Sequence, residues 1–294
     1  MFRLTGIAVL LLAAFAAAQD NKLKVYIAAD MEGVGGVSTW EVQADTKGRE
    51  YDKSCHLMTE EVNAAVAGAF DAGASEVVVG DSHGDGQNID LEALDKRAKL
   101  VRAWPRPLLM VQGIDNTFGA AALVGFYASQ DQFPAVLAHN LNSQRIMQIK
   151  INGTPVSDAG LAAAIAGESG VPVVFASGDQ TFTQEMKLLL GPIETVTVKE
   201  AIGFYAAEMM NPEAVRRLIR EGVRRAVEQR GAMKPYRVPH PVKLEVTFKQ
   251  PVNAEVVSYL PGVERSKGDT IVFTGRDMSE VARFISAILF VDAR

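Results

Sequence analysis

The stretch Val25–Gly36 (VYIAADMEGVGG) decides the fold of this 294-residue chain. Its first five residues are mostly apolar, and a short unbroken apolar run is typical of a buried strand in a parallel sheet. Asp30 and Glu32 follow where that strand should end, and ligands of open α/β sheets bind just beyond the carboxyl ends of strands. Residues two apart on an extended chain point to the same side. Two like charges held together need compensation, for which a metal ion is a common source.

The following segment repeats this pattern of a strand that ends in polar residues. Apolar residues at helical spacing predict a helix over 55–72, and 76–80 (EVVVG) predicts a second buried strand. That strand runs into 81–86 (DSHGDG), which contains His83. A strand–helix–strand unit favours a right-handed parallel crossover. Imidazole together with carboxylates is a standard ligand set for zinc, so His83 is a candidate partner of Asp30 and Glu32.

The rest of the chain indicates the fold class. Apolar runs alternate with helical patterns as far as about residue 205, whereas the later sequence has an amphipathic helix, a proline-rich linker and short alternating elements. We therefore predict an α/β protein with a mostly parallel central sheet flanked by helices and a smaller C-terminal α+β portion. The expected divisions are a signal peptide over 1–18, a metal-binding α/β domain over 19–205 and the α+β portion over 206–294.

The first residues have the pattern of a targeting segment. Arg3 precedes an apolar stretch over 6–15, and Ala16-Ala17-Ala18 offers an A-x-A cleavage site. This pattern is typical of a secretory signal peptide. An uncleaved anchor is the alternative, but the apolar core is too short for a permanent span. We expect an exported protein, periplasmic or secreted, without membrane contact after cleavage.

Composition excludes several classes of function. The formal net charge is −5 and no Lys/Arg run is present, which argues against nucleic acid as a partner. Cys55 is the single cysteine, so the chain has no intrachain disulfide and no cysteine-based zinc site. The glycines of 33–36 lack both the dinucleotide fingerprint and the Walker lysine, and the chain has no G-x-S-x-G elbow.

Other candidate residues each have a functional and a structural interpretation. His139 ends an apolar run and is either a packed core histidine or a functional one. Asp158 opens a predicted helix and is either its N-cap or a ligand. His56, on a helix, and His240, in the proline-rich linker, are expected to be structural or exposed. Cys55 is expected to be packed rather than nucleophilic.

Four short motifs carry a resemblance to a known family. They are 30–33 (DMEG), 58–61 (MTEE), 81–83 (DSH) and 152–156 (NGTPV). In this order they resemble the D-aminopeptidases of the DppA type, zinc metallopeptidases of the M55 family. The resemblance covers roughly residues 23–291 and implies that the chain is a metallo-aminopeptidase.

The resemblance also implies a dinuclear zinc site, with one departure. Asp30 would bridge two ions, Glu32 and His83 would complete the first site, and the catalytic histidine would be His139. The second ion would take a histidine and a glutamate, at positions where this chain has Tyr127 and Asp158. Neutral phenol is a poor zinc ligand because its pKa is roughly 10, and aspartate is about one methylene shorter than glutamate. We therefore expect one zinc ion, with a second ion that is weak, absent or of a harder, oxygen-preferring kind.

The leading hypothesis for function is an exported metal-dependent aminopeptidase. It would hydrolyse short peptides, including those with D-amino acids, through a metal-activated water. His139 would transfer protons or stabilise the tetrahedral oxyanion. Asp81 or Asp85 would hold the substrate's ammonium group, and the family's ring-shaped assembly implies a homo-oligomer, a decamer. The alternatives are a catalytically altered member that binds metal or peptide, and a hydrolase of another amide or ester.

Overall fold

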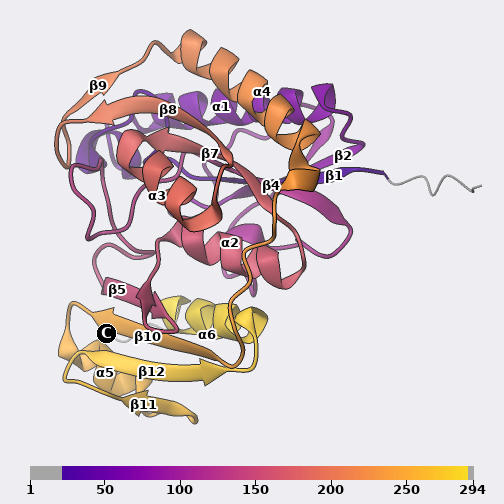
Figure 1. The fold of residues 1–294 in the computed structure, drawn as a ribbon. Coiled ribbons are helices and arrows are strands. Elements are labelled where there is room, and N and C mark those ends of the chain that lie inside the picture. The colour runs from indigo at the N-terminus through magenta and orange to yellow at the C-terminus, as the bar shows by residue number, and fades with distance from the viewer. Residues whose placement is uncertain (1–21, 291–294) are drawn as a thin grey trace, which may run out of the picture.

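The computed structural model describes residues 22–290, which form two sheets with their helices (Figure 1). The strand order is β3-β2-β1-β4-β7-β8-β9 in the larger sheet and β11-β12-β10-β5-β6 in the smaller one. The predicted signal peptide over 1–18 lies outside the described residues. Within them, no helix has the length and apolar character needed to cross a membrane.

The strands are β1 (Lys24–Ala29), β2 (Glu76–Asp81), β3 (Ala98–Val101), β4 (Phe118–Val124), β5 (Ile146–Ile151), β6 (Thr154–Pro155), β7 (Val173–Asp179), β8 (Glu194–Ala201), β9 (Ala207–Met209), β10 (Val242–Phe248), β11 (Val263–Arg265) and β12 (Thr270–Gly275). The helices are α1 (Tyr51–Asp71), α2 (Asp158–Glu168), α3 (Gln180–Leu190), α4 (Pro212–Glu228), α5 (Pro251–Val257) and α6 (Met278–Phe290), with a π-helical turn at Trp40–Ala44 and short 3₁₀ turns at Leu109–Val111 and Arg230–Ala232.

The larger sheet confirms the predicted α/β class. Strand β1 pairs in parallel with β2 on one side and with β4 on the other, and only the edge strand β9 runs antiparallel. Side chains of β1 alternate between two cores, because successive strand residues face opposite sides. Tyr26 belongs to the core that includes residues of α2 and α3, whereas Val25 and Ile27 belong to the core that includes residues of α1 and α4. Figure 1 accordingly shows α1 and α4 on one face and α2 and α3 on the other.

The smaller sheet differs from the expected C-terminal portion. Its strand β5 pairs antiparallel with β10, so the sheet joins residues 146–155 to residues after 241. Strand β9 and helix α4, which follow residue 205, belong instead to the larger sheet and its helical layer. The sheets therefore do not divide at 205/206, because pairing between distant strands leaves no trace in local sequence patterns. Helix α6 packs against α2 and connects the two layers (Figure 1).

The strand order places a crevice at the centre of the larger sheet. Along the sheet the chain runs outward from β1 through β2 to β3 in one direction, and through β4, β7 and β8 in the other. Ligand sites of open α/β folds lie at this reversal, outside the carboxyl ends of the strands. The apolar run over 134–139 contributes no strand; it forms an irregular segment near this edge.

Candidate active site

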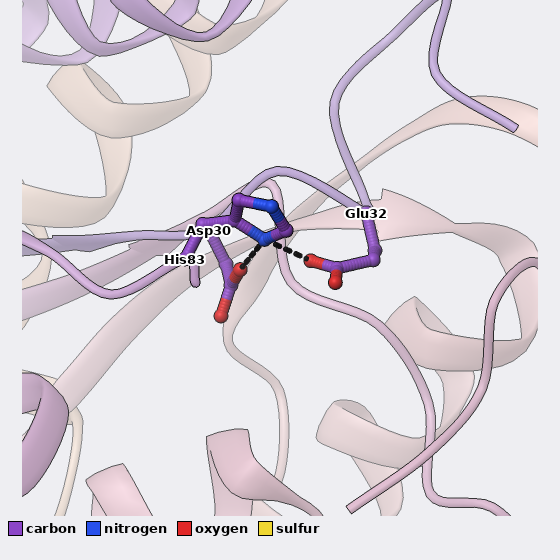
Figure 2. A group of neighbouring side chains, drawn as sticks. All are labelled: Asp30, Glu32 and His83. Carbon is purple, nitrogen blue, oxygen red and sulfur yellow. Dashed lines mark hydrogen bonds and ion pairs between the residues drawn. The ribbon is translucent and has the colours of Figure 1, made fainter. Parts of the chain in front are cut away.

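Three predicted ligands meet at the carboxyl ends of β1 and β2. Asp30 directly follows β1, Glu32 lies in the next turn, and His83 follows β2 (Figure 2). Nδ1 of His83 is 3.0 Å from Oε2 of Glu32 and 3.3 Å from Oδ1 of Asp30. All three side chains are buried, and one ligand atom from each lies within 4.8 Å of the others. This arrangement suits a cation held by two oxygens and one nitrogen.

A hydrogen bond behind His83 fixes which ring nitrogen faces the carboxylates. Its Nε2 lies 2.7 Å from the carbonyl oxygen of Ala44, in the π-helical turn. Because a carbonyl oxygen can only accept, Nε2 carries a proton and donates it, which leaves Nδ1 directed at Asp30 and Glu32. Metal-binding histidines are oriented in this way by a partner on the other nitrogen. The donor set and its support therefore fit a divalent cation.

The electrostatics of the three residues also favour a bound cation. Burial, together with the charge of Glu32, raises the pKa of Asp30 well above its usual range. Burial opposes ionisation of Glu32 too, but the facing His83 imidazole lowers the pKa of that carboxyl. Burial disfavours charge on His83, yet the two carboxylates raise its pKa. The raised pKa values of Asp30 and His83 favour proton uptake by the cluster, and a divalent cation would supply positive charge in place of those protons.

Two glycines let the loop after β1 lie against the loop after β4. The backbone N–H of Gly33 donates to the carbonyl oxygen of Gly125 at 2.7 Å. A Cβ atom on Gly33 would lie 1.9 Å from the oxygen of Phe126, and one on Gly125 would lie 2.3 Å from the oxygen of Asp30. Only glycine fits at both positions, so backbone contact fixes the ligand loop beside the segment that carries Tyr127.

Lys199, near the end of β8, supports the ligand loop and was not predicted from the sequence. Its buried Nζ atom donates to the carbonyl oxygens of Glu32, Val34 and Val37 at 2.5, 3.0 and 2.5 Å. Burial lowers the pKa of this lysine to about 8, although nearby carboxylates oppose that shift. The available signal was its position: Lys199 ends a strand-like run over 194–199, and the C-terminal ends of parallel strands form the ligand-binding edge of a sheet.

His139 lies in the same cavity as the three ligands. Its ring stacks on Tyr127, with centroids 4.0 Å apart, and forms a T-shaped pair with Trp40, with centroids 5.9 Å apart. Its Nδ1 donates to the carbonyl oxygen of Leu137 at 2.8 Å, so Nε2 is the nitrogen free to accept a proton. Asp179 supports this segment because it accepts the N–H of Val136 at 2.7 Å.

Tyr127 and Asp158 are close to each other but outside the group of three ligands. The Tyr127 hydroxyl donates to Oδ2 of Asp158 at 2.5 Å, and both side chains are buried. Burial and the neighbouring Asp158 charge raise the pKa of Tyr127 well above its usual value. Ser157, rather than Asp158, is the N-cap of α2, since its side chain accepts the N–H of Gly160. Asp158 is the first residue of that helix.

These residues line a cavity of about 360 Å³ with a polar and an apolar side. The polar residues of the lining, which form its polar side, are Asp30, Glu32, Ser82, His83, Tyr127, His139, Asn142, Ser143, Gln144 and Asp158. The apolar side is formed by Trp104, Leu109, Met110, Leu141, Leu289 and Phe290, so the end of α6 contributes to it. The rings of Trp104 and Phe290 stack with centroids 5.9 Å apart. The lining can therefore contact both a charged group and an apolar group of a ligand.

Several predicted candidates lie outside this cavity. The Asp81 carboxylate accepts the backbone N–H groups of Asn88 and Ile89 and the Asn88 side-chain amide, so its predicted role in holding an ammonium group is wrong. Asp85 is exposed and does not line the cavity. His56 is exposed, and His240 contacts Glu168 on the surface. Cys55 is a half-buried residue of α1, as expected.

Comparison with known proteins agrees with the geometry. The model of the M55 peptidase family, described as D-aminopeptidase, matches residues 23–287. The chain is 33% identical over 259 residues to a D-aminopeptidase of Bacillus subtilis (strain 168), covering 88% of this chain and 93% of that protein. It also superposes on a solved structure of the Zn-dependent D-aminopeptidase DppA from Bacillus subtilis, described as a self-compartmentalizing protease. That match has a TM-score of 0.87 at 32% identity and covers 91% of this chain and 97% of that chain.

Proposed function

Because the chain belongs to the M55 family of D-aminopeptidases, we propose that it removes N-terminal residues from short peptides, including peptides with D-amino acids, in a zinc-dependent reaction. One observation carries the proposal: Asp30, Glu32 and His83 converge beside His139 in one cavity. These three side chains would hold the ion. A zinc ion bound there acts as a Lewis acid and lowers the pKa of a water molecule.

The residues around the ion would move protons and position the substrate. His139 has its Nδ1 engaged by Leu137, so its Nε2 is available to take a proton during attack and to return one to the leaving amine. Contacts with Tyr127 and Trp40 restrict rotation of its ring. A ring held in one orientation lowers the entropic cost of reaching the reactive geometry.

The apolar side of the cavity would accept a substrate side chain. Trp104, Phe290 and Leu141 present hydrocarbon surface in the same cavity as the carboxylates. A peptide bound with its backbone toward the polar side would place one side chain against these residues. Removing that side chain from water contributes about 1.5–3 kcal/mol.

Export and self-assembly belong to the same proposal. The A-x-A pattern near Ala18 supports cleavage of a signal peptide and release into the periplasm or the medium. The self-compartmentalizing relative supports a homo-oligomer, for which we propose a decamer. Exposed apolar residues near the β8–β9 connection, Ile202, Phe204 and Tyr205, are suited to such an interface. Light scattering of the purified protein tests the assembly, and the N-terminal sequence of exported protein tests the cleavage.

The activity is tested with purified protein that has been stripped of metal and reloaded with zinc. Matched dipeptides that differ only in D- or L-alanine at the N-terminus are incubated with it, and released amino acids are measured. We expect zinc-dependent release, with His83→Ala inactive and the exposed His56→Ala as active as wild type. If no peptide in the panel is cleaved with zinc, manganese or cobalt, the proposed activity is wrong.

A further inference from the structure

The second pair of expected ligands already has its own hydrogen-bond partners. The hydroxyl of Tyr127 is 2.5 Å from Oδ2 of Asp158. The backbone N–H of Leu141 lies 3.0 Å from both carboxylate oxygens of Asp158. The carboxylate therefore receives donors from a side chain and from the backbone. The carboxylate oxygens of Asp158 thus have hydrogen-bond donors and do not need a cation as a partner.

A helix end also stabilises negative charge at Asp158 without a metal. It is the first residue of α2, directly after the N-cap Ser157. The N-terminus of a helix carries a partial positive charge that stabilises a carboxylate there. In the Asp30, Glu32 and His83 group, by contrast, two carboxylates face one imidazole. The two halves of the polar side thus differ in how their negative charge is balanced.

A metal ion at the second position would have to break the hydrogen bond between Tyr127 and Asp158. Tyr127 could ligate only after losing the proton that it donates to Asp158, and a phenolate would then lie against a buried carboxylate. Within residues 22–290, the one group of three close metal-ligating side chains comprises Asp30, Glu32 and His83. Asp158 does not join it.

We propose that the cavity binds one divalent cation per chain, at Asp30, Glu32 and His83, and that the Tyr127–Asp158 hydrogen bond occupies the place of a second metal site. The identity of the bound ion as zinc rests on the proposed function. The one-ion stoichiometry rests on the hydrogen bonds of Asp158. The Tyr127 hydroxyl also gives the buried Asp158 carboxylate a hydrogen-bond donor, so the two side chains can lie side by side in the interior.

The number of ions is measured on the full chain. The protein is stripped with a chelator, loaded with excess zinc and desalted, and zinc per chain is counted by native mass spectrometry and elemental analysis. We expect one ion in wild type, one in Tyr127→Phe and none in His83→Ala. Two ions in wild type, or none, would overturn the proposal.

A spectroscopic measurement on wild type does not depend on how well any variant folds. Zinc is added to the apoprotein while tyrosinate absorbance is followed, and we expect no new tyrosinate band. A zinc-dependent band that disappears in Tyr127→Phe would identify a phenolate ligand and contradict the proposal. Tyr26→Phe, which loses a buried hydroxyl bonded to Gln112 outside the cavity, is the matched control for folding.

The number of bound ions and the peptidase activity are measured independently, so either proposal can fail without the other. One ion per chain without peptide cleavage would support the inference and refute the activity. Two ions per chain with cleavage would refute the inference and support the activity.

Discussion

The Nζ atom of Lys199 lies 2.5 Å from the backbone oxygen of Glu32, although 167 positions separate the two residues. This contact, with those to Val34 and Val37, ties the ligand loop to the far half of the sheet. The candidate metal ligands are thus held from both sides of β1, by β2 through His83 and by β8 through Lys199.

Replacement of this lysine should weaken both the fold and the metal site. Lys199→Met leaves three buried carbonyl oxygens without their donor, and an unsatisfied buried acceptor costs about 1–3 kcal/mol. We expect a loss of about 3 kcal/mol in the free energy of unfolding and weaker zinc binding. Urea denaturation and zinc titration measure the two effects. Lys187→Met, at an exposed position of α3, is the control, and equal stability of the two variants would contradict the prediction.

Metal removal should lower stability through the same three ligands. A ligand that binds only the folded state stabilises it by about 2.7 kcal/mol at 100 times its Kd. We expect zinc to raise the melting temperature of the stripped protein and to have no such effect on Asp30→Asn. Differential scanning fluorimetry with and without zinc measures this shift. A shift of normal size in Asp30→Asn would show that the ion binds elsewhere.

His139→Ala should reduce turnover while retaining the metal. A positioned general acid–base contributes about 10²- to 10⁴-fold to the rate. We expect kcat to fall within that range, with zinc content unchanged, because His139 is not one of the three clustered ligands. Steady-state kinetics with elemental analysis separates the two effects. His240→Ala, on the surface, serves as the control.

The apolar side of the cavity should influence substrate binding more than chemistry. Trp104→Ala removes a ring that stacks on Phe290, and we expect KM for peptides with apolar side chains to rise about tenfold, which corresponds to about 1.4 kcal/mol. The effect on kcat should be smaller. Phe133→Ala removes a ring that is 82% exposed and outside the cavity, so its KM should equal that of wild type. Equal KM values for the two variants would exclude this side as a substrate site.

Stability should fall as pH rises from about 4.5 to 8 because of Glu61. This buried glutamate of α1 accepts the N–H of Gly35, and burial raises its pKa from 4.5 to about 8. The unfolded chain therefore loses this proton at lower pH than the folded protein, so ionisation favours unfolding across that window. At about 1.36 kcal/mol per pH unit, the free energy of unfolding at pH 7 should be about 3 kcal/mol lower than at pH 4.5 because of Glu61.

The variant Glu61→Gln isolates this effect. Glutamine keeps an acceptor for Gly35 and cannot ionise, so its unfolding free energy should depend less on pH. Near pH 4 both proteins carry a neutral side chain and should be similar, whereas at pH 7 the variant should be more stable. Parallel pH dependence of the two proteins in urea titrations would contradict the assignment.

The sequence was informative where chemistry and local pattern coincide. The apolar run before Asp30 predicted β1, the positions of Glu32 and His83 predicted the ligand group, and four motifs predicted the M55 family, which the comparisons confirm. The fold class was predicted for the same reason, since buried parallel strands are continuous apolar runs.

The remaining features depend on contacts between distant segments. Lys199 became important only through the packing of β8 near the loop after β1, and Trp40 through a π-helical turn that lies over both cavity histidines. The smaller sheet pairs β5 with β10, residues almost one hundred positions apart, which periodicity does not reveal. The hydrogen bonds that Tyr127 and Leu141 donate to the Asp158 carboxylate also cannot be predicted from the sequence.

The distance in sequence between the ligands and Lys199 has a consequence for biosynthesis. In a chain made from its N-terminus, Asp30, Glu32 and His83 leave the ribosome more than one hundred residues before β8. During that interval the loop after β1 lacks the ammonium group that secures its carbonyl oxygens. The support of the ligand loop is thus completed only after residue 201 of 294 has been made and β8 has docked.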